Sequence, residues 1–145
     1  MIVVQASSGG FNGGNFAEIM LNGKKVKLSP NSSGHERGLH LVIIDQKLGQ
    51  VIQAQVFDTY KSSQFLDKFI STSNIPQEAI VVAAVKDDFE KELSPFARDF
   101  FTKMGSKIIS NEVKYRHGYV FIGIQNSFNA NEKAGIELTD NVSVA

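Results

Sequence analysis

Two nearly continuous hydrophobic runs stand out along the chain. Residues 39–44 read LHLVII and residues 80–85 read IVVAAV, and polar residues follow both runs. Runs of this length and composition are typical of strands that are covered on both faces. We therefore expect both strands to be central, and we expect the fold to be organised around the segment 37–60.

That segment has the pattern of a β-hairpin. Residues 51–57 place Ile52, Ala54 and Val56 on one face, so only one side of this second strand should be buried. The loop between the two strands ends at Gly49. A glycine there suits the left-handed conformation of a bulged hairpin loop.

A second hairpin is predicted over residues 16–28. Asn22-Gly23 at its centre is the sequence of a type I′ turn, which needs a positive φ at both positions. A two-residue turn also fixes the register of the strands that it joins. That register places Ile19 opposite Val26, Ala17 opposite Leu28 and Glu18 opposite Lys27.

The remaining strand signals lie near the two ends of the chain. Residues 2–6 predict a short strand, whereas residues 7–14 are too rich in glycine to hold regular structure. The last core strands are expected within residues 113–124. Residues 136–144 keep a hydrophobic period of two, which predicts a C-terminal strand.

Two helices are predicted between the strands. Ser62 or Ser63 can cap the first helix, and its hydrophobic stripe consists of Phe65, Leu66, Phe69 and Ile70. Ser94-Pro95 begins the second, with the serine as the cap and the proline in the first turn. Its expected buried stripe is Phe96, Phe100 and Met104, and Gly105 marks its end.

These elements predict an α+β fold that is mostly β, with two antiparallel sheets packed as a sandwich and two or three short flanking helices. Too few helices separate the strands for a doubly wound parallel sheet. The 145 residues suit one domain over residues 1–145. Residues 1–15 would form its N-terminal strand and flexible glycine-rich segment, and residues 125–145 its C-terminal loop and strand.

Composition narrows the range of functions. The 15 basic residues equal the 15 acidic residues in number, and no basic run is interleaved with aromatic residues, so nucleic acid is not an expected partner. The chain has 0 cysteines, which excludes a disulfide scaffold, a thiol nucleophile and a cysteine-ligated zinc. No hydrophobic run approaches the roughly 20 residues of a membrane span, and the first residues are too short a run for a signal peptide.

Several short motifs occur in an order that resembles a known family. They are RGLHLV from Arg37, GQV from Gly49, FDTY from Phe57, VKDD from Val85, MGS from Met104 and YRHGYVFIG from Tyr115. In this order, over roughly residues 16–124, the chain is similar to the interleukin-like EMT inducer domain family. That family includes the pancreatic-derived cytokine-like factors and the stem domain of the O-mannose N-acetylglucosaminyltransferase.

The resemblance implies a non-enzymatic module of two antiparallel sheets around a polar cavity. In the transferase stem domain the module resembles a lectin. The positions that match its sugar-holding residues are Arg37, Asp87 and Arg116, with His117 and Tyr119 alongside. Such residues supply hydrogen-bond donors and acceptors for hydroxyl groups and an aromatic wall for a sugar ring.

The same residues also have a purely structural interpretation. Arg37, Asp87 and Arg116 can form a buried ion network that satisfies the ends of loops. Asp58 and Thr59 are expected to cap a turn rather than to touch a ligand. The sequence leaves the sugar site and the structural network both open.

No catalytic or metal-binding pattern accompanies these residues. The sequence DDFE from Asp87 lacks the regularly spaced oxygen ligands of a calcium loop. His35, His40 and His117 show no metal-ligand spacing, and no G-x-S-x-G motif occurs. We expect no enzymatic activity, no cofactor and no metal.

We therefore predict a non-enzymatic interaction module, extracellular or on a cell or virion surface, that binds a glycan or a glycoprotein. The alternative is a structural subunit that forms a homo-oligomer or filament by donating a terminal strand to a neighbouring copy. The strand-like residues at both ends and the glycine-rich segment 7–14 motivate that alternative. Its competitor is the pairing of both termini within their own sheet.

Overall fold

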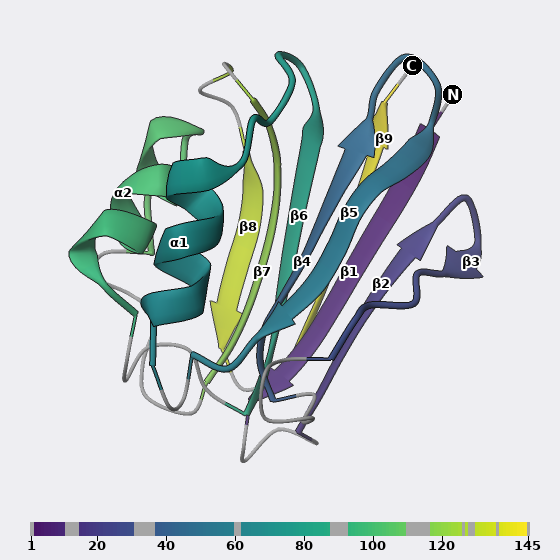
Figure 1. Ribbon diagram of the computed structural model, residues 1–145. Helices are drawn as coiled ribbons and strands as arrows, with labels where there is room; N and C mark the ends of the chain where they lie inside the picture. Colours follow the sequence, from purple (N-terminus) through teal and green to yellow (C-terminus); the bar gives the residue numbers. More distant parts are fainter. Residues whose placement is uncertain are drawn as a thin grey trace.

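In the computed structural model the chain folds into a mostly β structure with helices on one side (Figure 1). The structure describes residues 2–10, 15–30, 37–59, 62–87, 93–109, 117–125, 127, 130–135 and 137–144; for residues 10, 87 and 137–144 it describes the backbone alone. The strands are β1 (Ile2–Gly10), β2 (Phe16–Leu21), β3 (Lys24–Lys25), β4 (Gly38–Asp45), β5 (Gln50–Phe57), β6 (Ile80–Asp87), β7 (Gly118–Ile124), β8 (Asn131–Gly135) and β9 (Glu137–Val144). The helices are α1 (Gln64–Thr72) and α2 (Pro95–Lys103).

The described strands form one mixed sheet, in the order β3-β2-β1-β6-β4-β5, with β7 and β8 continuing from β6 and with β9 paired to β1. The prediction of two separate antiparallel sheets is therefore not confirmed. The strands β1, β2, β3 and β9 are joined to the other strands by a short parallel pairing of β1 with β6, at Gly9 with Lys86 and Gly10 with Asp87. The other strand pairings are antiparallel.

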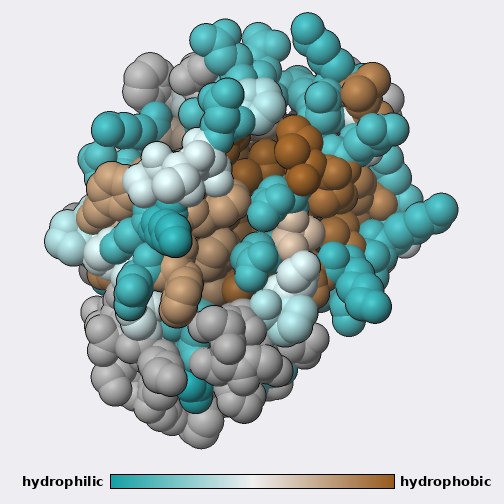
Figure 2. Space-filling model, in the orientation of Figure 1, coloured by the Kyte–Doolittle hydropathy of each residue, from teal (hydrophilic) through white to brown (hydrophobic). Residues whose placement is uncertain are grey.

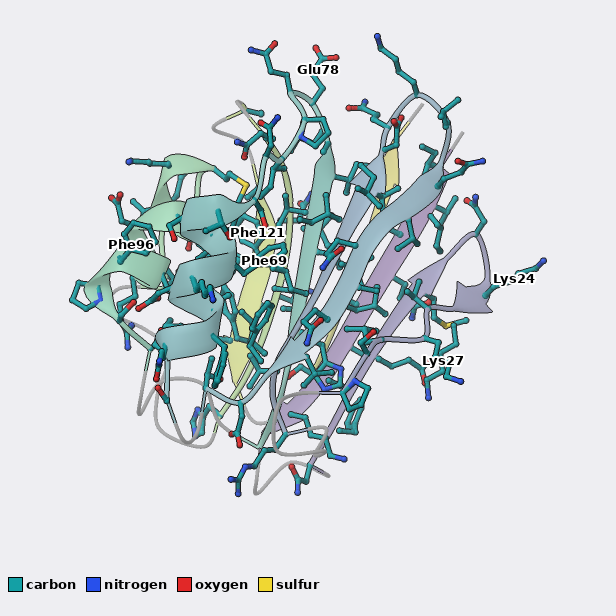
Figure 3. All side chains as sticks on the ribbon, viewed as in Figure 1. Lys24, Lys27, Phe69, Glu78, Phe96 and Phe121 are labelled. Atoms are coloured by element: carbon teal, nitrogen blue, oxygen red, sulfur yellow. The ribbon has the colours of Figure 1, made fainter. Side chains whose placement is uncertain are left out.

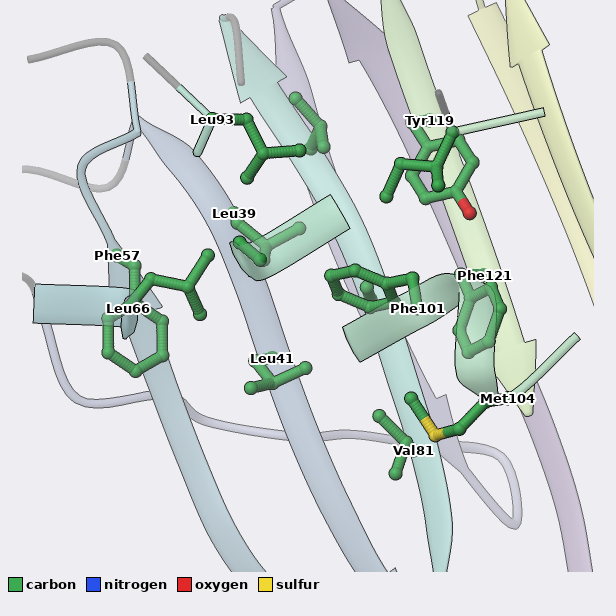
Figure 4. Packing of buried hydrophobic residues seen from close by; sticks show 14 residues of the cluster. Leu39, Leu41, Phe57, Leu66, Val81, Leu93, Phe101, Met104, Tyr119 and Phe121 are labelled. Atoms are coloured by element: carbon green, nitrogen blue, oxygen red, sulfur yellow. The ribbon is translucent and has the colours of Figure 1, made fainter. Parts of the chain in front are cut away.

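Hydrophobic side chains are buried on both faces of β4, β6 and β7. The cluster on the face toward the helices, here the helix-side core, joins these strands to α1 and α2 (Figure 4). The cluster on the other face, here the strand-side core, joins them to β1 and β2. Because β1 and β2 cover a face of strands in their own sheet, the sheet curves back on itself. The prediction that residues 39–44 and 80–85 form central, doubly covered strands is confirmed.

Both predicted hairpins are present in the described residues. Asn22 and Gly23 have φ values of +51° and +79°, as a type I′ turn requires. The pairing of Met20 with Lys25, together with a hydrogen bond from the Val26 amide to the Ile19 carbonyl, gives the expected register.

The strand β5 departs from the expected alternation. A register shift opposite Ile43 and Ile44 interrupts its pairing with β4, and Ile52 falls at this irregularity. Ile52 is consequently 46% exposed, although the sequence pattern predicted it to be buried. Figure 2 shows hydrophobic surface over the upper part of β5, where Val51 is also exposed.

The helices begin where predicted, but the expected buried stripes are partly wrong. Ser94 accepts a hydrogen bond from the Ala97 amide and so caps α2. The buried residues of α2 are Ala97 and Phe101, whereas Phe96 is 49% exposed. In α1, Leu66 is buried and Phe65 is 53% exposed. In each helix, the hydrophobic residue expected to begin the buried stripe lies on the surface.

The strands near the termini are longer and more numerous than predicted. β1 continues to Gly10, so the expectation of irregular structure over residues 7–10 is wrong, whereas residues 11–14 lie outside the described residues. The predicted C-terminal strand corresponds to β9, but β8 was not predicted. β1 and β9 pair with each other from Ile2 and Val144 to Gly9 and Glu137.

Candidate functional site

Several strands end together at one edge of the sheet, which we call the polar sheet end. There Gly38 of β4 pairs with Lys86 of β6, and Gly10 of β1 pairs with Asp87 of β6. Phe57, the last residue of β5, pairs with the second residue of β4. The polar sheet end thus gathers the residues next to these positions, including Arg37 and Asp58.

Arg37 is fixed by an ion pair at the polar sheet end. Its Nε donates to both carboxylate oxygens of Asp58, at 3.0 Å each. The Asp58 side chain is 6% exposed and the Arg37 side chain is 32% exposed. The carboxylate is therefore held inside the protein, while part of the guanidinium-bearing side chain faces solvent.

Gly38 explains why the arginine lies beside this aspartate. The φ of Gly38 is +109°, and a Cβ at this position would lie 2.1 Å from the carbonyl oxygen of Phe57 and 2.8 Å from the amide nitrogen of Thr59. Only glycine permits so close an approach of two backbones. The Arg37-Gly38 motif and the Phe57-Asp58-Thr59 motif are thus two halves of one contact.

The other predicted site residues are described to different extents. Asp87 is the last residue of β6, so its backbone lies at the polar sheet end, but the structure describes nothing of its side chain. His117 is partly buried and directly precedes β7. Arg116 lies outside the described residues. The backbone positions of Arg37 and Asp87 therefore come together, whereas the contacts of the complete predicted set are not described.

Tyr119 lies in the helix-side core and its side chain is fully buried. Its hydroxyl donates to Glu132 Oε1 at 2.6 Å. The Ser106 hydroxyl donates to the same oxygen at 2.6 Å, and the Lys107 amide donates to Glu132 Oε2 at 2.6 Å. Because its ring has no exposed surface, the predicted role of Tyr119 as a wall for a sugar ring is not supported.

The surroundings of Tyr119 favour its neutral form. Burial raises the pKa of the Tyr119 hydroxyl well above its ordinary value, and the negative charge of Glu132 and its hydrogen bond raise it further. The Ser106 hydrogen bond acts in the opposite direction. Tyr119 therefore remains a hydrogen-bond donor to Glu132, and this group joins α2, β7 and β8 through the loop that follows α2.

A buried serine connects β1 to the central strands next to Tyr119. The Ser8 hydroxyl donates to the Val85 carbonyl of β6 and accepts a hydrogen bond from the Tyr119 amide of β7 at 3.1 Å. The described ladder between β6 and β7 ends one position earlier, where Ala84 pairs with Val120. The hydroxyl of Ser8 thus stands between two strands at the place where their next pair would form.

Two residues of these networks were not identified from the sequence. Asp58 was interpreted as a turn cap, and its part in the ion pair follows from the approach of β4 to the end of β5. Glu132 belongs to a strand, β8, that lacks a hydrophobic pattern strong enough to be predicted. The DT sequence after a strand was a usable signal for Asp58, whereas no local signal singles out Glu132.

A hollow of about 370 Å³ lies next to Asp58, between β5 and α1. The exposed ring of Phe65 and the side chains of Phe69 and Lys68 line it together with Asp58. Within the described ranges, no group of three or more His, Asp or Glu residues could hold a metal ion. None of the helices described is long and hydrophobic enough to cross a membrane.

Comparison with known proteins connects these motifs to a family. The sequence profile described as "Interleukin-like EMT inducer" matches residues 37–127, which include both halves of the Arg37–Asp58 contact, the Ser106 loop and β7. This match covers more than half of the chain. It extends from Arg37 to beyond the last residue of β7 and leaves out β1, β2 and β3.

Individual proteins that are similar to this chain are distant relatives of it. The chain is 34% identical over 107 residues to the mouse cell migration-inducing and hyaluronan-binding protein, and 33% identical over 107 residues to the human protein of the same name. Each alignment covers 73% of this chain but 8% of the relative. Mouse Protein FAM3D is 27% identical over 100 residues, which cover 68% of this chain and 44% of that protein.

Proposed function

Since the chain belongs to the interleukin-like EMT inducer family, we propose that it is a non-catalytic module that binds carbohydrate, outside the cell or at a cell or virion surface. The observation that carries this proposal is the fixed, partly exposed Arg37 at the polar sheet end. A guanidinium held in one orientation presents several donors in a plane, which suits recognition of neighbouring oxygens on a ligand.

The surroundings of Arg37 fit the same purpose. Asp58 orients the guanidinium from inside the protein, and the backbone of Asp87 lies at the same edge of the sheet. We propose that Arg37, Asp87, Arg116 and His117 contact the sugar, with Asp58 as a positioning residue. A protein similar to this chain is named for binding hyaluronan, which supports a glycan as the class of ligand.

The test compares two identical substitutions. Arg37→Lys keeps the charge but removes the planar donor group, and we expect it to weaken glycan binding roughly 10- to 100-fold, as the loss of charged hydrogen bonds does. Arg98→Lys is the matched control, because Arg98 binds the Ile109 carbonyl through Nη1 beside α2. Ligands are first identified on a glycan array and then titrated calorimetrically against both variants.

A result in which Arg37→Lys and wild type bind every glycan equally would contradict the proposed site. Absence of binding to any glycan by correctly folded wild-type protein would contradict the proposed function itself. Circular dichroism of each variant separates loss of binding from loss of folding.

Self-assembly through a terminal strand remains the competing proposal. In the structure, β1 pairs with β2 and β9, and Ile2, Val4 and Ala6 are buried in the strand-side core. Donation of either terminal strand would require these pairings to be exchanged between copies. Because both terminal strands are already paired within their own sheet, we favour the carbohydrate-binding function over a filament subunit.

A further inference from the structure

A wide groove lies on the face of the sheet opposite the helices. It has a volume of about 1000 Å³, compared with about 370 Å³ for the hollow beside α1. One wall comes from β2, β3 and the segment that follows them to Pro30, and the other comes from β4, β5 and β6. The groove is large enough to hold several sugar rings rather than a single small group.

Basic residues predominate among the charged groups of this groove. Lys25 and Lys27 line it from the β3 side, Lys86 lines it from β6, and His40 lines it from β4. Glu18 is the acidic residue in the lining. The whole chain has equal numbers of basic and acidic residues, so this local excess of lysine is not a consequence of overall composition.

Hydrophobic side chains lie between these charges. Phe16, Val26, Leu28 and Val56 belong to the same lining. Of these, Phe16, Val26 and Leu28 are half-buried, so part of each side chain is exposed to a ligand in the groove. Alternating lysine ammonium groups and apolar surface match a ligand that carries both negative charges and flat, weakly polar ring faces.

We infer that this groove binds an anionic glycan, a chain of sugar rings bearing carboxylates; the inference rests on the proposed carbohydrate-binding function and names its substrate class. Lys25, Lys27 and Lys86 pair with the carboxylates. Phe16 and Leu28 contact the ring faces. The groove shares β4, β6 and Lys86 with the polar sheet end, so one glycan chain can occupy both.

The presence of Glu18 distinguishes a glycan from a polyphosphate. A carboxylate in the lining repels phosphates and carboxylates alike, but it accepts hydrogen bonds from sugar hydroxyls, which a polyphosphate with a negative charge on every unit lacks. The cations are lysines, which act as point charges and do not require the bidentate geometry that arginine gives to phosphate recognition. The groove therefore suits a polymer of alternating charge and hydroxyl groups.

The chain offers a matched control for the lysines. Lys24 is exposed and stands next to Lys25 in β3, but it is not among the residues that line the groove. Figure 3 shows Lys24 and Lys27 projecting in different directions from this part of the molecule. Lys24→Gln thus makes the same chemical change as Lys25→Gln or Lys27→Gln, but at a neighbouring position that does not line the groove.

The experiment titrates the full chain with a hyaluronan tetrasaccharide and with an uncharged N-acetylglucosamine tetrasaccharide, at low and at moderate salt. We expect the charged probe to bind more tightly and to weaken as salt is added. Lys25→Gln and Lys27→Gln should each weaken it roughly two- to fivefold, and the double variant about tenfold, whereas Lys24→Gln should leave it unchanged.

The outcomes separate this inference from the proposed function. If the charged probe binds but the groove variants match Lys24→Gln, while Arg37→Lys reduces binding, the groove inference is wrong and the proposed function stands. If neither tetrasaccharide binds and a glycan array is also negative, both are wrong. If polyphosphate or single-stranded RNA binds through the same lysines more tightly than the glycan, the assignment to a glycan is wrong.

Discussion

At the scale of single residues, the structure of the polar sheet end depends on Gly38 and on the ion pair between Arg37 and Asp58. The sequence predicted that Arg37 belongs to the candidate site but interpreted Asp58 as a turn cap. Arg37 pairs with Asp58 because β4 approaches the end of β5 closely at Gly38. The pattern of residues along the sequence contains no information about the distance between these two segments. The motif was therefore visible in the sequence, but its contact was not.

Substitution of Gly38 by alanine tests this geometry. We expect Gly38→Ala to lower the free energy of unfolding by about 2 to 5 kcal/mol, because it adds overpacking against the Phe57 carbonyl to the cost of a positive φ. Gly23→Ala is the control, because Gly23 also has a positive φ but nothing lies within 4 Å of the place that a Cβ would occupy. The control should cost about 1 to 2 kcal/mol. Equal losses in urea unfolding would contradict the steric explanation.

At the scale of elements, the cap of α2 was predictable, whereas the Ser63 side chain makes no capping hydrogen bond in α1 and the buried faces of both helices were not predicted correctly. Ser94-Pro95 contains the local chemistry of a helix start, so the beginning of α2 follows from the sequence. Phe96 and Ala97 both begin a stripe at helical spacing. Which stripe is buried depends on the rotation of α2 against the sheet, and the structure buries the smaller residue, Ala97. A prediction from side-chain size and hydrophobicity alone therefore assigned the buried face to Phe96 instead of Ala97.

Contacts between α1 and α2 also escape local patterns. Asp67 of α1 accepts hydrogen bonds through Oδ1 from the Ser63 hydroxyl at 3.0 Å and from the Ser94 hydroxyl at 2.6 Å. The Ser94 amide in turn donates to the Ser63 hydroxyl at 3.2 Å. The residue that caps α2 is thus bonded to the first turn of α1.

A double-mutant cycle measures this connection. Ser94→Ala alone should cost about 1 kcal/mol through loss of the cap. Its coupling to Asp67→Ala, which removes the acceptor, should be about 0.5 to 2 kcal/mol because the two side chains share a partly buried hydrogen bond. The control cycle uses Asp99 and Lys103, an ion pair on α2 whose side chains are 58% and 77% exposed. We expect no measurable coupling there. Similar coupling in both cycles would show that Asp67 does not join the helices.

At the scale of the whole molecule, the fold depends on contacts between distant parts of the sequence. The sequence predicted the central strands, both hairpins and two helices, because each has a local pattern. It did not predict β8 or the parallel contact of β1 with β6. The parallel contact joins segments that are far apart in the chain. β8 pairs with β7, the strand just before it, but its residues are mostly polar or small and have no hydrophobic period to reveal them.

Stability of the whole molecule at alkaline pH should depend on Tyr119. Its pKa in the folded protein is raised above the value of about 10 in the unfolded chain. The stabilisation is therefore complete below about pH 10 and is lost as the pH rises through the folded-state pKa, because the unfolded chain releases its proton first. Tyr119→Phe should cost about 1 to 2 kcal/mol at neutral pH, since it removes a donor to Glu132.

Urea unfolding at several pH values checks this prediction. The difference in unfolding free energy between wild type and Tyr119→Phe should be constant at neutral pH and should shrink above about pH 10. Tyr60 and Tyr115 are present in both proteins, so their titration cancels in the difference. A difference that stays constant into the alkaline range would mean that Tyr119 ionises as easily folded as unfolded.

The hydroxyl of Ser8 protects one amide of β7 in an unusual way. The Tyr119 amide donates to that hydroxyl, 111 residues away in sequence, whereas Phe121 on the same strand pairs with Ala83 of β6. Exchange of the Tyr119 amide with deuterium therefore requires β1 to withdraw, while exchange at Phe121 requires β6 and β7 to separate. Two amides on a single strand thus report on two different opening motions, and the Tyr119 amide records how often the first strand leaves the rest of the sheet.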